Sequence, residues 1–531
     1  MDVERALAAL NRQQRFLRYL GPVDYPDGSV SSRFEFVHAL YRDVLYDRIP
    51  VGYRKELHRR VGQALEALWG ERSSEIAAEL AMHFEQSRLL ERAGFYRRHA
   101  ALNAQRRRAY GEARMHFERA LSLLSMEPPS DDRTEREALL RMGLGAALMP
   151  ALGWGAPEVE ESYARALTLC EGFKDNLGLF PALWGLWLFY WGRGPLSTAQ
   201  QIADDLRRLS CGHDDLALRL QAQHACWATA FLRGHLEQAC DQAAGGLALY
   251  KADRDAPMAA SYGSHDAGVC ARYFRARALA MRGMLAEAVQ TADKAIEAAR
   301  ALNDPFSLAL AHVFASSVHE VRRDVTAVKT HADAALNIAR AEDFRLLNVW
   351  AAPLQGWSAV HEGRHGKGLQ YIEAALAEAR SNGSNSFVPY SLGLYAECCL
   401  IAGRTADADN AIAEAFAIVS RTGERFWEAE LFRLRGEIEL VRSAGRCVDP
   451  QIETTFLTAI DVAQRAGARV LVLRASRSLA KFYHCVGRSN DGRRILASPQ
   501  REFSEGLLSE DKHILEFLLR EQNVGDSCIE G

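Results

Sequence analysis

Residues 361–365, His-Glu-Gly-Arg-His, match the H-E-x-x-H pattern with which many metalloproteases bind zinc. This chemistry needs both histidines on one face of an unbroken helix, beside a glutamate that activates the metal-bound water. Gly363 stands at a repeated turn position, so we expect a helix to end between the histidines. Tyr371 replaces the third histidine of the extended motif. We therefore predict no zinc chemistry here, and no phosphate loop at 363–368, because no strand precedes it.

A second group of chemically capable residues lies between Tyr262 and Cys270, where a repeat step lengthens from 40 to 49 residues. His265 and Asp266 supply a donor and an acceptor, and Cys270 follows one helical turn later. Solenoids place binding residues in loops that depart from the repeat, so these four residues are candidates for binding a ligand or partner. Alternatively, Asp266 caps the next helix and His265 packs on it. A metal site would need a further ligand that the sequence does not place, so we predict no metal and no cofactor.

Aromatic side chains recur at helical spacing in two neighbouring segments. Trp184, Trp187 and Trp191 fall at i, i+3 and i+7 on one helical stripe. Trp227 and Phe231 repeat an i, i+4 pair one unit later. Such stripes usually pack in the core between adjacent helices. The alternative is that these rings line a concave groove and anchor a peptide or small ligand there.

A repeat of about forty residues must position these groups. Turn positions recur at this interval, and small or apolar residues recur at the fifth and twelfth positions after the turn. The repeated positions are Gly283, Arg323, Gly363 and Gly403, then Ala288, Val328, Gly368 and Ala408, and then Ala295, Ala335, Ala375 and Ala415. Small residues let two antiparallel helices approach closely. The pattern predicts an all-α fold, a right-handed α-solenoid of about eleven TPR-like helix pairs.

The N-terminal segment has a different pattern. We expect a helix over residues 2–20, a turn at Pro26-Asp27-Gly28, a strand over 32–37 and a helix from Ala39 to Tyr46. Together these elements predict a small winged-helix-like unit that lacks a basic recognition helix. The expected domains are this remnant with its linking helix at 1–70, short helical repeats at 71–126, the solenoid at 134–520 and a disordered tail at 521–531.

Composition restricts the possible functions. The chain has 65 basic and 68 acidic residues, whereas a general nucleic-acid surface needs a basic excess. The ten cysteines include no C-x-x-C pair, which indicates thiols in a reducing compartment. No apolar run approaches the roughly 20 residues that span a bilayer, and no secretory signal is visible. We expect a cytoplasmic protein that contacts neither nucleic acid nor membrane directly.

Segments spread over nearly the whole chain carry a family resemblance. They are residues 34–40 (FEFVHAL), 42–46 (RDVLY), 54–60 (RKELHRR), 75–84 (EIAAELAMHF), 155–160 (GAPEVE), 262–270 (YGSHDAGVC), 423–431 (GERFWEAEL) and 503–506 (FSEG). Together they resemble bacterial signal-transduction (STAND/AAA-type) ATPase regulators, in which a nucleotide-binding module precedes a winged-helix element and a TPR-like array. Members of that family are often fused to class III adenylate or guanylate cyclases, kinases or DNA-binding effectors.

The sequence departs from that family because it contains no G-x-x-x-x-G-K-[ST] phosphate loop and no cyclase or kinase motif. The resemblance implies that His38 could reach a bound nucleotide, whereas without an ATPase core a structural role at a strand-to-helix junction is the preferred interpretation.

We therefore expect a non-catalytic sensor or scaffold arm of a nucleotide-regulated signalling or transcriptional regulator, which serves a separately encoded ATPase or cyclase module. It would bind a protein partner or small effector in the solenoid groove. The alternative is that the chain is part of an ATPase or an adenylate or guanylate cyclase whose catalytic modules lie outside it.

Overall fold

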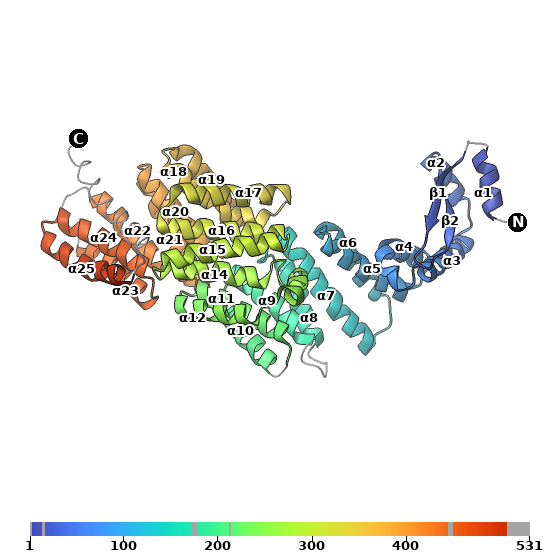
Figure 1. The fold of residues 1–531 in the computed structure, drawn as a ribbon, viewed down its shortest axis with the longest axis horizontal. Coiled ribbons are helices and arrows are strands. Elements are labelled where there is room, and N and C mark those ends of the chain that lie inside the picture. The colour runs from blue at the N-terminus through green and yellow to red at the C-terminus, as the bar shows by residue number, and fades with distance from the viewer. Residues whose placement is uncertain (1–2, 13–15, 171–177, 212–213, 444–449, 507–531) are drawn as a thin grey trace. The chain divides into compact units, whose positions relative to one another are not determined.

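The computed structural model describes residues 3–12, 16–170, 178–211, 214–443 and 450–506 (Figure 1). These residues belong to two compact units, of residues 1–147 and 148–531. Helices dominate both units, and the strands of the described chain form one two-stranded sheet. No helix in the described ranges is both long and apolar enough to cross a membrane.

The first unit begins with a helix, a β-hairpin and a second helix, and it continues as packed helices. Its elements are α1 (Val3–Arg12), β1 (Leu17–Asp24), β2 (Val30–Phe36), α2 (Ala39–Asp47), α3 (Val51–Trp69), the 3-10 helix η1 (Gly70–Ile76), α4 (Ala77–Gln86), α5 (Leu90–Arg106), α6 (Tyr110–Leu124) and α7 (Asp131–Leu152), which runs on into the second unit. Leu17 pairs with Phe36 in the antiparallel hairpin. The strand predicted over 32–37 and the helix predicted after it are confirmed.

The single helix predicted over residues 2–20 is wrong in its second half. Helix α1 ends at Arg12, and Leu17 already belongs to β1, where its side chain is buried. Two residues oppose a longer helix, because Pro22 lacks an amide hydrogen and Gly21 adopts a φ of 114°. Pairing with β2 satisfies the backbone hydrogen-bonding groups of this segment. The periodicity of apolar residues within the segment does not reveal that such a partner strand exists.

The second unit is a succession of helix pairs. Its elements are α8 (Pro157–Cys170), α9 (Leu179–Arg193), α10 (Leu196–Cys211), α11 (Leu216–Leu232), α12 (Leu236–Leu249), α13 (Ala252–Asp255), the 3-10 helix η3 (Ala256–Ser261), α14 (Ala267–Met281), α15 (Leu285–Ala301), α16 (Pro305–Arg322), α17 (Val325–Ala341), α18 (Arg345–His361), α19 (His365–Asn382), α20 (Val388–Ile401), α21 (Thr405–Thr422), α22 (Glu428–Ser443), α23 (Pro450–Arg465), α24 (Arg469–Cys485) and α25 (Ser489–Gly506). Neighbouring helices in this order pack on one another.

The predicted turn positions join the helices of each pair. Gly283 and Gly363 adopt φ of 90° and 84°, and Arg323 adopts 64°, the left-handed conformation that ends many helices. The small residue after the turn permits close approach, because a Cβ atom added to Gly368 of α19 would lie 2.5 Å from the carbonyl oxygen of Gly356 in α18. The predicted α-solenoid of TPR-like helix pairs is confirmed.

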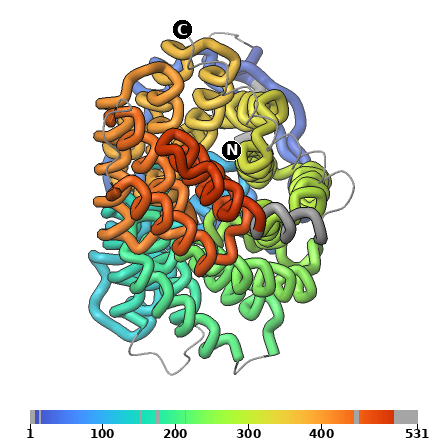
Figure 2. The backbone as a smooth tube through the Cα atoms, turned by 90° about the vertical axis from the view of Figure 1, so that its left-hand side faces the viewer, coloured from blue at the N-terminus to red at the C-terminus, as the bar shows by residue number. Residues whose placement is uncertain are grey.

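The second unit curves until early and late helix pairs touch. The amide nitrogen of Asn385, just before α20, donates to the carbonyl oxygen of Gly192 in α9 at 2.9 Å. The amide nitrogen of Arg425, before α22, donates to the carbonyl oxygen of Leu232 in α11 at 2.7 Å. Figure 2 shows the green, yellow and orange segments following one another around a ring.

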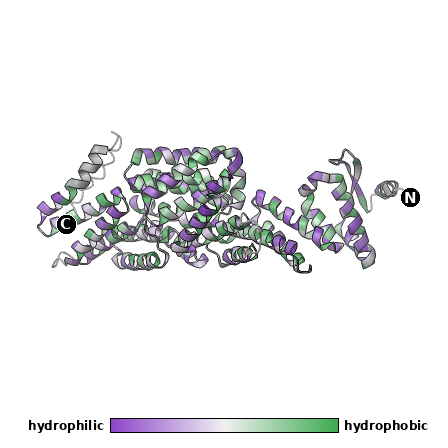
Figure 3. Cartoon of the chain, turned by 90° about the horizontal axis from the view of Figure 1, so that it is seen from below, coloured by the Kyte–Doolittle hydropathy of each residue, from purple (hydrophilic) through white to green (hydrophobic). Residues whose placement is uncertain are grey.

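Apolar side chains from the inner helices fill this ring. The ring centroid of Phe387 lies 5.9 Å from that of Trp191, 5.6 Å from that of Phe314 and 5.1 Å from that of Trp350. Apolar and polar residues alternate along the helices in Figure 3, as expected when one face of each helix packs inward. Around Phe387, the concave side of the solenoid is thus occupied by the chain's own side chains.

Candidate functional site

The extra residues between the helix pairs lie mostly near the surface over 251–261 and are buried from Tyr262 onward. They form α13, η3 and the turn that leads to α14, and at most 4% of each of Tyr262, His265, Asp266 and Cys270 is exposed. Asp266 Oδ1 accepts a hydrogen bond from the amide of Val269 at 2.8 Å, so the cap interpretation is confirmed. Burial raises the pKa of the Asp266 carboxyl. The part of these four residues in ligand binding stays a prediction.

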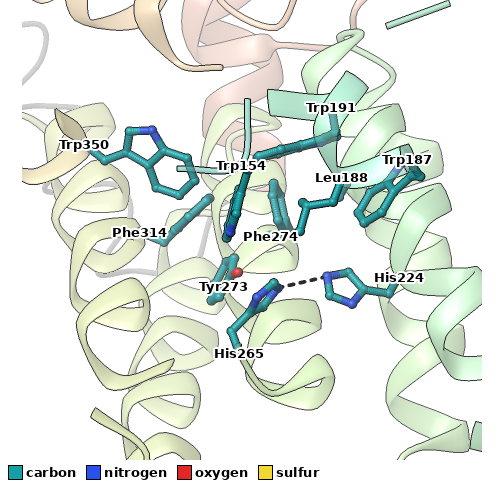
Figure 4. A pocket seen from close by; sticks show the side chains of 11 residues that line it. Trp154, Trp187, Leu188, Trp191, His224, His265, Tyr273, Phe274, Phe314 and Trp350 are labelled. Carbon is teal, nitrogen blue, oxygen red and sulfur yellow. Dashed lines mark hydrogen bonds between the residues drawn. The ribbon is translucent and has the colours of Figure 1, made fainter. Parts of the chain in front are cut away.

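The structure brings a histidine that the sequence analysis missed to this group. His224 of α11 lies with its Nε2 atom 3.2 Å from Nε2 of His265 (Figure 4). The same Nε2 atom lies 3.0 Å from Sγ of Cys270. His224 and His265 are 41 residues apart, which is about one repeat. This spacing is the sequence feature that could have indicated that the two histidines lie close together. His224 thus adds a third side chain with a possible metal-ligating atom to His265 and Cys270.

Burial disfavours the charged form of each of the three side chains. Desolvation lowers the pKa of His224 well below its usual value, and also lowers that of His265. It raises the pKa of the Cys270 thiol to about 12. Among the described residues, these three form the group of His, Cys, Asp or Glu side chains whose ligand atoms lie close enough to share a metal ion.

A small void lies beside the two histidines. Figure 4 shows His224 and His265 with Trp154, Trp187, Trp191 and Trp350 around it. Its volume is about 10 Å³, which is room for about one water molecule and far less than a ligand pocket needs.

The two aromatic stripes lie in the core between helices, which was the first of the two interpretations of their spacing. Trp184, Trp187 and Trp191 on α9 and Trp227 and Phe231 on α11 are each at most 3% exposed. The Trp187 indole nitrogen donates to Thr229 Oγ1 at 2.8 Å, and the Trp184 indole nitrogen donates to the carbonyl oxygen of residue 221 at 3.3 Å. These contacts fix the rings inside the protein rather than on an open groove. A direct role of these five aromatic residues in binding stays a prediction.

A larger hollow, the basic hollow, opens where the ring closes. It has a volume of about 680 Å³ and lies between the α9–α10 turn and helices α19, α20 and α21. Its charged and amide residues are Arg193, Arg380, Glu414, Arg421 and Asn385. Sequence reasoning missed this hollow because its two sides are almost two hundred residues apart and meet only through ring closure.

The basic hollow carries an excess of positive charge. Three arginines and one glutamate line it, which leaves two positive charges. Arg380 is neutralised by a bidentate ion pair with Glu414 at 2.7 and 2.9 Å. In contrast, Arg193 donates to a backbone carbonyl at 3.0 Å, and Arg421 donates to the amide oxygen of Asn385 at 3.0 Å. Two guanidinium groups thus have only neutral partners in the described chain.

The H-E-x-x-H pattern is divided between two helices, as predicted. Helix α18 ends at His361 and α19 begins at His365, with Gly363 at a φ of 84° between them. His361 packs on the ring of Trp357 at a centroid distance of 4.1 Å. Its Nε2 atom lies 3.7 Å from a carboxylate oxygen of Glu397.

His38 lies at the junction between β2 and α2. Its Nδ1 atom accepts a hydrogen bond from the amide of Leu40 at 3.1 Å, so it caps α2. The residue is exposed and its ring faces that of Tyr41. His38 thus lies at the predicted junction and has a structural role as the cap of α2, but the expectation that it is packed there is wrong, because the side chain is exposed. Proximity to a nucleotide stays a prediction.

Comparisons with known proteins give the following similarities. No protein-family model matches the chain. An uncharacterized protein of Rhizobium meliloti (strain 1021) is 26% identical over 463 residues, which are 86% of this chain and 44% of that protein. The chain therefore spans less than half the length of this relative.

Solved structures with a similar arrangement have low sequence identity. A Rap protein complexed with competence and sporulation factor has a TM-score of 0.45 and 12% identity, and the match covers 78% of this chain and 98% of that one. NprR in complex with its cognate peptide NprX has a TM-score of 0.46 and 12% identity, with coverages of 69% and 98%. The APC/C hetero-tetramer Cut9–Hcn1 has a TM-score of 0.48 and 11% identity, with coverages of 84% and 84%.

Proposed function

We propose that this chain is the non-catalytic helical-repeat arm of a nucleotide-regulated signalling or transcriptional regulator. It acts by binding an acidic segment of a protein partner in the basic hollow. The resemblance to STAND/AAA-type regulators supports the regulatory role, and the ATPase or cyclase module that the arm serves lies outside the residues of this chain. The partner is a protein rather than nucleic acid or a membrane, in accord with the small net charge of −3.

The single observation that carries the proposal is the chemistry of the basic hollow. Its volume lies within the range of about 300–1,000 Å³ that is usual for ligand sites. Val388 and Ile418, which are largely buried, contribute apolar atoms to its lining. A carboxylate entering the hollow would replace the neutral acceptors of Arg193 and Arg421 with an acceptor of opposite charge, so that each hydrogen bond would also be an ion pair.

The packing of side chains inside the ring favours the basic hollow, rather than the inner face of the helices, as the binding site. Large side chains already pack around Phe387, and the void beside His224 holds about one water molecule. A partner segment binding there would have to displace buried rings, whereas the basic hollow is open without rearrangement.

A peptide-display selection tests the proposal. The purified full chain would be presented to a random peptide library, and the recovered peptides would be assayed on wild type and on the Arg193→Ala/Arg421→Ala variant. We expect enrichment of Asp- and Glu-containing peptides whose affinity falls at least about tenfold in the variant, because each charge-assisted bond contributes about 1.5–3 kcal/mol.

A matched control separates the hollow from general surface charge. Arg340 on α17 also donates to an asparagine side-chain oxygen, at 3.1 Å, but it does not line the hollow. Arg340→Ala should bind the selected peptides as wild type does. Peptides that bind wild type and the double variant equally would overturn the proposed site.

The non-catalytic role has its own test, with labelled ATP added to the pure chain. We expect no stoichiometric binding at micromolar concentration and no hydrolysis, because the sequence lacks the loop and lysine that hold nucleotide phosphates. Stoichiometric binding with hydrolysis would contradict the proposal and favour an enzyme.

A further inference from the structure

The distances within the cluster of His224, His265 and Cys270 are close to those of a zinc site. In a tetrahedral site with Zn–N near 2.05 Å and Zn–S near 2.3 Å, ligand atoms lie about 3.3 Å apart for two nitrogens and about 3.6 Å apart for nitrogen and sulfur. The observed separations from His224 Nε2 are 3.2 Å to nitrogen and 3.0 Å to sulfur. An opening of about half an ångström brings His224 Nε2 to the zinc-site separation from both other atoms. All three ligand atoms lie within 4.8 Å of one another.

The other ring nitrogens of both histidines are held by oxygen atoms. His265 Nδ1 lies 2.9 Å from the carbonyl oxygen of Gly263, and His224 Nδ1 lies 3.3 Å from the side-chain oxygen of Gln221. An oxygen of this kind accepts but does not donate, so these contacts favour the tautomer in which each Nδ1 carries the hydrogen of its neutral ring. Histidines that bind metals usually donate their second ring nitrogen to such an oxygen, which fixes the ring and its tautomer.

This arrangement leaves two lone pairs facing each other. With both hydrogens on Nδ1, the Nε2 atoms of His224 and His265 are acceptors at a separation of 3.2 Å, and the Cys270 thiol has one hydrogen to share. Both rings are at most 3% exposed, and burial opposes the charged imidazolium that would place a proton between them. A metal cation that is bound by both nitrogens and by a thiolate would remove this repulsion between facing lone pairs.

The surroundings suit a metal ion that carries net positive charge. The carboxyl of Asp266, next to His265 in the chain, accepts hydrogen bonds from the amide of Val269 and the hydroxyl of Tyr250, and the hydroxyl of Tyr273 hydrogen-bonds to the Cys270 sulfur. The void bordered by both histidines has room for about one water molecule, which can complete a tetrahedral set. Thiolate with imidazole is a ligand set that zinc prefers among the common divalent ions.

We propose that His224, His265 and Cys270 bind one zinc ion inside the second unit. The ion enters as the chain folds, since the site is buried, and Cys270 loses its proton to solvent when it binds. The site connects α11 with the segment that leads into α14, and it thereby holds the extra residues in place. This inference is independent of the basic hollow, which shares none of these ligands.

Metal analysis of the full chain tests the proposal without any variant. The protein would be expressed in zinc-supplemented medium, purified without chelator and analysed by mass spectrometry of its metals. We expect one zinc ion per chain and a lower melting temperature after removal of zinc with a strong chelator, because a ligand of the native state stabilises it. Zinc content far below one per chain, in both this protein and protein refolded with zinc, would overturn the proposal.

Cobalt substitution identifies the ligands. Protein refolded with Co²⁺ should show thiolate-to-cobalt charge-transfer absorption, which Cys270→Ser should lose together with most of the bound metal. Cys226→Ser is the matched control, because Cys226 is buried on α11 but lies outside the cluster, and it should keep both signals. The His361→Ala/His365→Ala variant should also keep them. Loss of the metal in the control variants, or its retention in Cys270→Ser, would contradict the assignment.

Discussion

Arg474 of α24 and Glu320 of α16, 154 residues apart, form a buried ion pair at 3.3 Å. Arg474 also lies 3.4 Å from Glu430 of α22. Both partners of the first pair are at most 7% exposed, so water does not screen the charges. This pair connects helix α24 near the end of the solenoid to helix α16 in its middle.

We predict that Arg474→Ala lowers the free energy of unfolding by about 3–5 kcal/mol, because it leaves the Glu320 carboxylate buried without its main cation. Urea denaturation measures this loss. Arg465→Ala is the control, since Arg465 pairs with Asp461 at 2.8 Å on the surface and should cost about 0–1 kcal/mol. Equal effects of the two substitutions would show that the buried pair does not stabilise ring closure.

A pair of glycines on α19 tests the repeat itself. A Cβ added to Gly368 would lie 2.5 Å from a carbonyl oxygen and 2.6 Å from Val360, whereas one added to Gly366 would meet nothing within 4 Å. We expect Gly368→Ala to cost about 1–3 kcal/mol through overpacking. Gly366→Ala should be neutral or slightly stabilising, since alanine suits a helix better than glycine. Thermal unfolding of both variants decides, and a neutral Gly368→Ala would contradict the close packing of α18 and α19.

Glu424 predicts a pH dependence of stability. Burial raises the pKa of its carboxyl to about 8, while the amide of Phe387 and the charge of Arg277 act in the opposite direction. The unfolded chain loses this proton near pH 4.3, so the folded state holds one more proton at intermediate pH. Stability contributed by this residue is therefore full below about pH 4.3 and falls as the pH rises toward 8, by at most about 1.4 kcal/mol per pH unit.

The variant Glu424→Gln isolates this effect, because glutamine keeps an acceptor for Phe387 but does not ionise. Urea midpoints of wild type should fall relative to those of the variant between pH 5 and pH 8. Parallel curves for the two proteins over this range would show that the carboxyl is not held protonated.

The repeat could be predicted from sequence because its determinants are local. Turn residues such as Gly283 and Gly363 and small residues such as Gly368 act between helices that are adjacent in the chain. The same reasoning separated His361 from His365 correctly. Local patterns also showed that Asp266 could cap a helix.

Features that depend on contacts between distant residues could not be predicted in this way. The β1 strand needs β2, and the basic hollow needs Arg193 and Arg421 to meet by ring closure. His224 had no local signal beyond its place one repeat before His265. The burial of the turn from Tyr262 to Asp266 likewise depends on packing against helices from other pairs, which periodicity does not specify.

A charge-swap titration tests the proposed binding function most directly. A selected acidic peptide would be titrated into wild type and into Arg421→Glu, followed by the same peptide with its acidic residue replaced by lysine. We expect the affinity of Arg421→Glu for the acidic peptide to be more than about tenfold lower than that of wild type, because the substitution places like charges together. The same variant should bind the lysine peptide more tightly than wild type does, because the charges are exchanged. Equal binding of the acidic peptide by wild type and Arg421→Glu would contradict the basic hollow as the partner site.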